Sequence, residues 1–139
     1  MRLWHYELIP VLPKKMLISQ WRECIAIKRQ WEKGTLKHRL VSYVMDYNKA
    51  YFMKYVLRIS DELNYRNIKH NSKFLYEISD FCDDQLDLDV MFGELEYPQH
   101  NDRYLKQCLY NLQEKADRGI ISKEEWEEIY EKFKDFIEY

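Results

Sequence analysis

Apolar residues recur at helical spacing along most of the chain, and short breaks separate these stretches. Pro10 and Pro13 fall near the start, and each proline biases the residue before it away from helix. We therefore expect an extended entry segment over residues 1–13. A helix then runs from about residue 14 to residue 32 and stops at Gly34, because proline suits the first turn of a helix and glycine suits its C-terminal cap.

The predicted first helix has two different faces. One face is apolar, with residues three or four positions apart: Leu17, Trp21, Cys24 and Trp31, with Ile18 and Ile25 beside them. The other face holds small and charged residues: Ser19, Arg22, Glu23, Ala26 and Arg29. We expect the first face to lie in the core and the second to stay open, with the small side chains leaving the Arg22–Glu23 pair uncrowded.

The middle of the chain predicts two further helical regions. The first covers residues 37–66, with an interruption and a new N-cap at Asn48, and the second covers residues 71–82. Their expected core residues are apolar or aromatic: Val41, Val44, Met45, Tyr51, Phe52, Tyr55, Val56, Ile59, Phe74, Leu75 and Ile78.

The last third of the chain predicts a connector and a helical hairpin. Residues 83–100 are acidic and irregular, so we expect a connector there. Residues 101–118 and 122–138 then form two helices around Gly119, and Ser122 with Glu125 has the spacing of a capping box. Such hairpins often mediate self-association, so we expect the C-terminal hairpin to be a site of self-association.

These elements predict an all-α fold: a compact helical domain with an extended N-terminal segment and a C-terminal helical hairpin. The chain has 139 residues with only 3 Gly and 3 Pro, which suits one helical domain. Cys24, Cys82 and Cys108 lie far apart without metal-ligand spacing, so we expect reduced thiols. There is no apolar stretch of roughly 18 residues and no signal peptide, which predicts a cytoplasmic protein without a membrane partner.

The net charge of −2 conceals two oppositely charged halves. Residues 1–78 hold 15 Lys and Arg against 7 Asp and Glu, whereas residues 79–139 hold 7 against 17. A basic half attracts phosphate, but two such halves also attract each other on folding. The charge distribution is thus compatible with nucleic-acid binding without requiring it.

The N-terminal amine and Glu23 are the groups that could carry chemistry. An α-amine is partly unprotonated near neutral pH and can attack the C1′ carbon of a deoxynucleoside to form a Schiff base. A carboxylate then stabilises positive charge and moves protons, and an arginine such as Arg22 can hold a phosphate. On its own, an arginine–glutamate pair on a helix is usually only a solvated ion pair.

Several segments of the chain resemble the pyrimidine-dimer DNA glycosylase family of the phage endonuclease V type. Leu17 and the run Trp21-Arg22-Glu23 resemble that family's Leu-x-x-x-aromatic-Arg-Glu segment, at the matching distance from the start. Residues 34–69 resemble its middle helices. The opening residues, from Met1 to Pro13, resemble a bacterial subgroup of the family that begins Met-Arg-Leu-Trp-His. The resemblance covers about half the chain.

This resemblance implies a metal-independent glycosylase and AP lyase without a cofactor, acting on double-stranded DNA that contains pyrimidine dimers or abasic sites. The family's nucleophile is the N-terminal α-amine, its carboxylate falls on Glu23, and a substrate-contacting arginine falls on Arg22. Since the bulky Arg2 normally leaves Met1 in place, the amine would belong to Met1. The candidate catalytic residues are thus Met1, Arg2, Arg22 and Glu23. The alternative is a non-catalytic nucleic-acid-binding or protein-interaction module on the same scaffold.

The chain also departs from the family pattern at several positions. A family arginine falls on Ala26, where Arg29 is a candidate replacement, and a family histidine falls on Met16, where His5 is a candidate replacement.

The resemblance and the predicted elements together divide the chain into two parts within a single domain. Residues 1–82 form an endonuclease V-like helical region, and residues 83–139 form the acidic connector and hairpin packed on it. The expected DNA-binding residues form the densest basic stretch: Lys14, Lys15, Arg22, Lys28, Arg29, Lys33, Lys37, His38 and Arg39.

The four histidines do not have the spacing of metal ligands. His5, His38, His70 and His100 are scattered along the chain, and we therefore expect no metal site.

Overall fold

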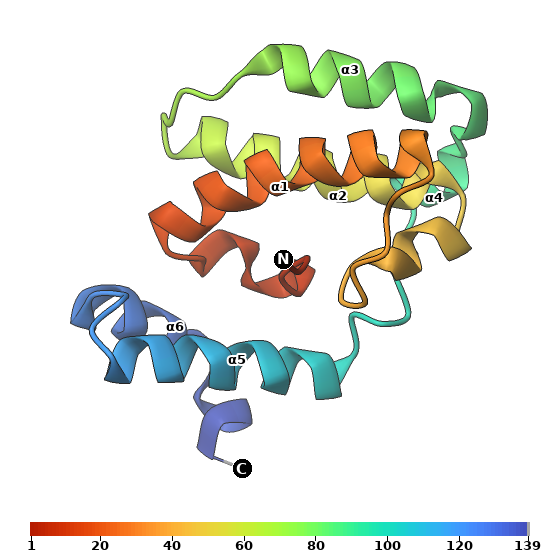
Figure 1. Ribbon diagram of the computed structural model, residues 1–139. Helices are drawn as coiled ribbons and strands as arrows, with labels where there is room; N and C mark the ends of the chain where they lie inside the picture. Colours follow the sequence, from red (N-terminus) through yellow and green to blue (C-terminus); the bar gives the residue numbers. More distant parts are fainter. Residues whose placement is uncertain (139) are drawn as a thin grey trace.

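The computed structural model describes residues 1–138, with side chains described for residues 1–137, and contains only helices and loops over this range (Figure 1). This confirms the all-α prediction. The α-helices are α1 (Lys14–Lys33), α2 (Lys49–Tyr65), α3 (Ser72–Cys82), α4 (Leu88–Phe92), α5 (Asp102–Asp117) and α6 (Lys123–Glu138). Three short 3₁₀ helices accompany them: η1 (Tyr6–Val11), η2 (Ser42–Asp46) and η3 (Asp83–Gln85).

Local sequence signals define most helix ends as predicted. The Asn48 side chain accepts a hydrogen bond from the Ala50 N–H at 3.1 Å and caps α2. Gly34 ends α1 with φ of +73°, a left-handed conformation that glycine adopts without steric cost. In the capping box, Ser122 N–H donates to Glu125 Oε1 at 2.9 Å, and Glu125 N–H donates to Ser122 Oγ at 3.1 Å.

The structure differs from the prediction where tertiary contacts override the local pattern. The entry segment is not extended throughout, because residues 6–11 form η1, which the His5 side chain caps and which buries Leu8 and Ile9. Residues 37–41 are not helical, and Met45 in η2 is 41% exposed. The connector contains η3 and α4, and α6 bends at Phe133, whose φ and ψ are −124° and 20°.

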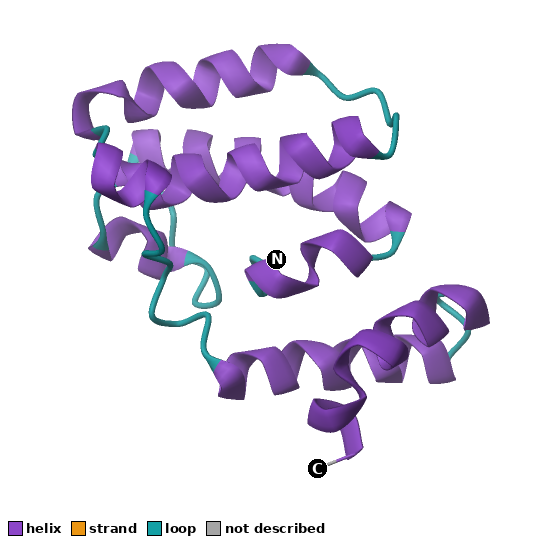
Figure 2. Ribbon diagram, turned by 180° about the vertical axis from the view of Figure 1, so that it is seen from behind, coloured by secondary structure: helices purple, strands orange, loops and turns teal. Residues whose placement is uncertain are grey.

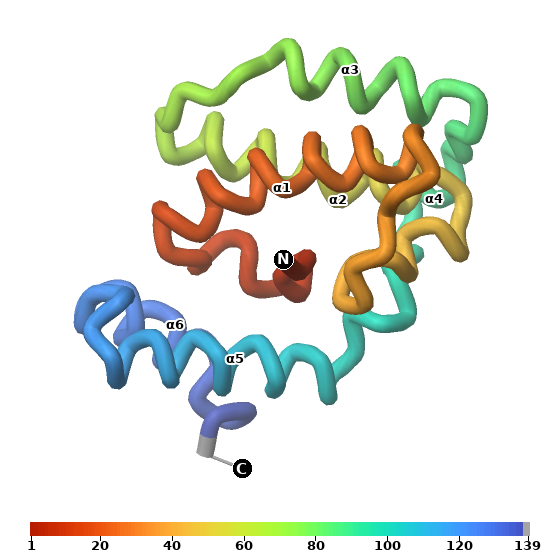
Figure 3. Tube along the Cα trace, in the orientation of Figure 1, coloured from red at the N-terminus to blue at the C-terminus, as the bar shows by residue number. Residues whose placement is uncertain are grey.

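The N-terminal segment lies between two groups of helices. Helices α1, α2 and α3 pack together on one side, and the α5–α6 hairpin lies on the other (Figures 1 and 2). The backbone trace in Figure 3 places the N-terminus in the middle of the molecule, between α1 and α5. Because buried residues of both groups belong to one hydrophobic cluster, the chain is already buried at Leu3, Trp4 and His5, whereas most chain termini are poorly packed.

The acidic part of the chain is tied to the basic part by ion pairs. Lys49 contacts Asp84 at 3.0 Å, Lys54 contacts Glu96 at 3.3 Å, and Arg58 also contacts Glu96. The opposite charges of the two halves thus meet within the fold.

Two further features concern the predicted class of protein. All three cysteines are free and buried. None of the described helices is both long and apolar enough to cross a membrane.

Candidate active site

The N-terminus opens onto a pocket of about 250 Å³ at the open face of α1. Its lining comes from segments far apart in sequence: Met1, Arg2, Trp4, Met16, Ser19, Glu23, Asn111 and Lys115. The predicted amine and the predicted carboxylate are therefore brought to one pocket. Ser19, one helical turn before Glu23, lines it too, as its small side chain on the open face suggested.

Glu23 is a half-buried carboxyl group in this pocket. Burial raises the pKa of Glu23 above its ordinary value, and the positive N-terminus acts against that rise to a smaller extent. The carboxyl group is thus close enough to the N-terminus to respond to its charge. It also takes up a proton more readily than a surface glutamate, which suits a group that moves protons.

Gln20 connects the N-terminal segment to α1. Its Nε2 donates to the Arg2 carbonyl oxygen at 2.9 Å, and its Oε1 accepts from the Trp4 N–H at 2.8 Å. The same Nε2 donates to Glu23 Oε2 at 2.9 Å. One side chain therefore contacts both the backbone that carries the amine and the carboxylate beside it.

Arg22 lies at a different pocket instead. It is exposed and lines a pocket of about 310 Å³ together with Trp21, Lys69 and His70. Within the described part of the chain, no acidic side chain forms an ion pair with Arg22, so its guanidinium is open to an anion. Arg22 is adjacent to Glu23 in the sequence but does not line the pocket of Glu23.

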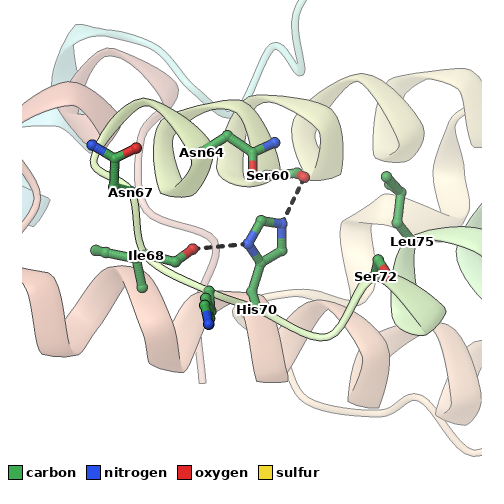
Figure 4. A pocket seen from close by; sticks show the side chains of 8 residues that line it. Ser60, Asn64, Asn67, Ile68, His70, Ser72 and Leu75 are labelled. Atoms are coloured by element: carbon green, nitrogen blue, oxygen red, sulfur yellow. Dashed lines mark hydrogen bonds between the residues drawn. The ribbon is translucent and has the colours of Figure 1, made fainter.

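A larger pocket of about 640 Å³ adjoins the Arg22 pocket, and Lys69 and His70 line both. His70 Nδ1 lies 3.2 Å from the Ile68 carbonyl oxygen and Nε2 lies 2.9 Å from Ser60 Oγ (Figure 4). A carbonyl only accepts, so Nδ1 carries a proton and donates it to the Ile68 oxygen, while Nε2 is hydrogen-bonded to the Ser60 hydroxyl. These hydrogen bonds fix the imidazole ring, which also meets the Trp21 ring edge-on at 4.8 Å between centroids.

Two residues of the predicted basic stretch are already paired within the protein. The Lys28 side chain is only 7% exposed and contacts Glu32 at 3.1 Å and Glu77 at 3.2 Å. Arg29 forms two hydrogen bonds to Glu77, each 3.0 Å long. The hydrogen bonds from Arg29 are the main reason that the pKa of Glu77 is lowered to about 2, and Lys28 adds to this effect. Lys28 therefore does not lie on an exposed basic face, and Arg29 would have to leave Glu77 to reach a phosphate.

The other residues of that stretch are exposed: Lys14, Lys15, Arg22, Lys33, Lys37, His38 and Arg39. They extend from the start of α1 past its end, a length of roughly 30 Å at 1.5 Å per residue.

His5 does not reach the candidate pocket. Its side chain is buried, its Nδ1 accepts a hydrogen bond from the Glu7 N–H at 3.1 Å, and its ring stacks on Tyr6 at 4.8 Å. Met16, at the position of the family histidine, does line the pocket. The interpretation of His5 as a replacement for that histidine is therefore wrong.

Sequence reasoning missed four residues at the site: Trp4, Gln20, Asn111 and Lys115. Gln20 left a signal, since it lies three residues after Leu17 and four before Cys24 on the apolar face, where a polar residue is informative. Asn111 and Lys115 are one turn apart on α5, and only the docking of α5 brings them to the pocket.

Among the described side chains, no group of His, Cys, Asp and Glu is arranged to hold a metal ion.

Comparison with known proteins finds one matching family. A family model described as pyrimidine dimer DNA glycosylase matches residues 1–76. The match contains η1, α1 and α2 and most of the pocket lining, but not α5. No curated protein and no solved structure matches the chain.

Proposed function

The chain belongs to the pyrimidine dimer DNA glycosylase family, and we propose that it is a DNA glycosylase and AP lyase that works through a Schiff base on its N-terminal amine. Its substrate is damaged double-stranded DNA, with a pyrimidine dimer or an abasic site. One observation carries this proposal: the N-terminus and Glu23 line the same pocket, and the positive N-terminus acts on the carboxyl group.

In the first step of the proposed reaction, the unprotonated Met1 amine forms a bond to C1′ of the damaged nucleotide. The glycosidic bond breaks, its electron pair leaves with the base, and the base takes up the proton that the newly bonded amine loses. Protonated Glu23 gives its proton to the ring oxygen as the sugar opens to the iminium, and the resulting carboxylate stabilises that cation. The same carboxylate then accepts a C2′ proton, the electron pair of that C–H bond forms the C2′–C3′ double bond, and the 3′ phosphate leaves, which is the lyase step.

Binding of the duplex falls to the exposed basic residues along α1, among them Arg22, which precedes Glu23 in the sequence. Because Arg22 has no acidic partner in the described structure, it reaches a phosphate without breaking an ion pair. Contacts of this kind position the duplex without reading its sequence. In the proposed site, Arg2 lines the pocket beside the amine.

Borohydride trapping tests this proposal directly. The protein is mixed with a duplex that contains one abasic site, and borohydride reduces any Schiff base to a stable adduct. We expect an adduct with the wild type, none when the N-terminus is acetylated, and a loss of about a hundredfold or more in rate for Glu23→Gln. Glu7→Gln is the matched control, because Glu7 is an exposed carboxylate of the same segment that does not line the pocket.

Peptide mapping of the adduct identifies the attacking amine, which matters because the Lys115 side chain lines the same pocket. An adduct on Met1 supports the proposed mechanism, and an adduct on Lys115 overturns the role of the α-amine. If DNA binds but no adduct forms with a free N-terminus, the chain is a binding module on this scaffold. Self-association through the C-terminal hairpin remains a separate prediction, which sedimentation of the free protein checks.

A further inference from the structure

Gln20 is a completely buried amide on the apolar face of α1. Burying an amide is unfavourable unless its polar groups are paired. Its two N–H groups are paired with the Arg2 carbonyl and Glu23. Its oxygen accepts a hydrogen bond from the Trp4 N–H. The Tyr55 hydroxyl lies 2.9 Å from the same amide oxygen and 2.7 Å from the Trp4 carbonyl oxygen, so these two oxygens share the Tyr55 proton. The hydrogen-bonding capacity of the amide is thus full.

We propose that Gln20 is the positioning residue that sets the N-terminal amine against the Glu23 carboxylate. This inference rests on the proposed function. Gln20 itself cannot touch DNA, since it has no exposed surface. It acts through two other groups, the backbone of residues 2–4 and the side chain of Glu23.

On the backbone side, Gln20 fixes the register of the N-terminal segment. The Arg2 carbonyl and the Trp4 N–H flank Leu3, which is fully buried. A slip by one residue would break both hydrogen bonds and move the amine by about 3.5 Å along the chain. A displacement of only about 1 Å at a reacting centre can already cost a hundredfold in rate.

On the helix side, Gln20 orients the carboxylate. Residues three apart on a helix are neighbours, and the Gln20 N–H holds Glu23 Oε2. Within the described residues, the other carboxylate oxygen has no hydrogen-bond partner and is free to face a substrate. A donated hydrogen bond also favours the ionised carboxylate, against the effect of burial.

The first test compares Gln20→Met with Gln30→Met. Methionine fills similar space without the amide groups. Gln30→Met is the control, because it makes the same change ten residues further along α1, at a half-buried side chain that does not line the pocket. With the abasic duplex at saturation, we expect the trapping rate of Gln20→Met to fall by about ten- to a hundredfold with an unchanged dissociation constant. Gln30→Met should stay within about threefold of the wild type.

The second test needs no DNA. NMR titration follows the pKa of the N-terminal amine in the wild type and in Glu23→Gln, and the difference measures the coupling between amine and carboxylate. We expect the Gln20→Met background to reduce that difference and to raise the pKa of Glu23. Unchanged coupling, together with a rate loss explained by the unfolded fraction, overturns the proposal and makes Gln20 a structural residue.

If Gln20→Met does not fold, a second variant with one glycine inserted after Met1 is tested instead. The insertion leaves the bonds of Gln20 intact and moves only the amine, so coupling and trapping should both be lost, and their retention contradicts the proposal. If the wild type itself forms no adduct, the proposed function fails, while the titration still decides the role of Gln20.

Discussion

His100 shows how a single buried residue joins the two parts of the chain. Its Nδ1 accepts a hydrogen bond from the Tyr6 N–H at 3.2 Å, and its Nε2 lies 2.8 Å from the Tyr43 hydroxyl oxygen. Only the neutral ring accepts at Nδ1, and burial, followed by the effects of His5 and Arg58, lowers the pKa of His100 to about 3. The folded state therefore requires an uncharged His100.

Acid should destabilise the protein through this residue. The pKa of histidine is about 6.5 in an unfolded chain, so the stability that neutral His100 contributes is complete above that pH and is lost as the pH falls towards 3. The slope from one such group reaches about 1.4 kcal/mol per pH unit. In urea unfolding at several pH values, His100→Asn should lose stability less steeply than the wild type in this range. Parallel curves would contradict the prediction.

The half-buried, ionised Glu23 should lower the stability of the folded protein near neutral pH. Burial raises its pKa, so the stability associated with the protonated form is present at low pH and is lost as the pH rises through that raised pKa. Glu23→Gln should therefore melt a few °C above the wild type near neutral pH, and the gap should close on acidification. Calorimetry of both proteins at neutral and at acidic pH checks this prediction. A difference in melting temperature that does not depend on pH would mean that packing, not the charge of Glu23, is the cause.

At the scale of elements, an ion-pair cluster joins α1 to α3. Lys28 is buried in α1, and Glu77 of α3 holds both its ammonium and the Arg29 guanidinium. A buried cation that loses a partner is unfavourable, so this contact matters more than a pair on the surface.

We expect Glu77→Ala to lower the free energy of unfolding by about 1–3 kcal/mol, mainly because Lys28 loses a partner. The matched control is Glu114→Ala, whose pair with Arg118 is exposed at both ends (64% and 69%) and should cost well under about 1 kcal/mol. Chemical denaturation of the three proteins measures both values. Equal losses would mean that the burial of Lys28 is unimportant.

The ion pair of Arg29 with Glu77 also leads us to expect that Arg22 and Arg29 contribute differently to DNA binding. Arg22→Ala should weaken binding and lower the slope of log affinity against log salt by about 1, because one phosphate contact is lost. Arg29→Ala removes the same charge from a guanidinium already bound to Glu77 and should have a smaller effect. Titration of a labelled duplex at several salt concentrations compares them, and a larger effect for Arg29 would reverse this assignment.

At the scale of the whole molecule, the hairpin is part of the site as well as of the core. The family match ends at residue 76, but α5 supplies Asn111 and Lys115 to the pocket. The Tyr104 hydroxyl of α5 donates to the Leu3 carbonyl. The N-terminal segment is thus held from both sides.

A fragment of residues 1–82 should therefore not fold into the native structure. It lacks the apolar residues of α5 and α6 that share a cluster with Leu3 and Leu8, and His100 and Tyr104 no longer hold the entry segment. We expect a loss of cooperative thermal unfolding by circular dichroism. Adding residues 83–139 as a separate chain should restore it if docking alone is required, and a cooperative fragment on its own would contradict this prediction.

The amino-acid sequence by itself determined the long helices and several of their caps. Gly34, Asn48 and the Ser122–Glu125 box act on backbone groups a few residues away, so their effects are legible in the local sequence. The spacing of Leu17, Trp21 and Cys24 likewise depends only on the helical period. The family resemblance added Glu23 as the carboxylate to examine, and this residue does line the pocket with Met1.

Only the tertiary structure decided which polar groups face one another. Lys28 and Arg22 belong to the same basic stretch, yet one is buried against Glu77 and the other is open. His5 and His100 are distant in sequence, yet their rings lie 5.4 Å apart. Such pairings depend on how helices dock, and docking is set by apolar burial over the whole core rather than by neighbours along the chain. For the same reason, Gln20 could be recognised as the link between amine and carboxylate only once the N-terminal segment was seen against α1.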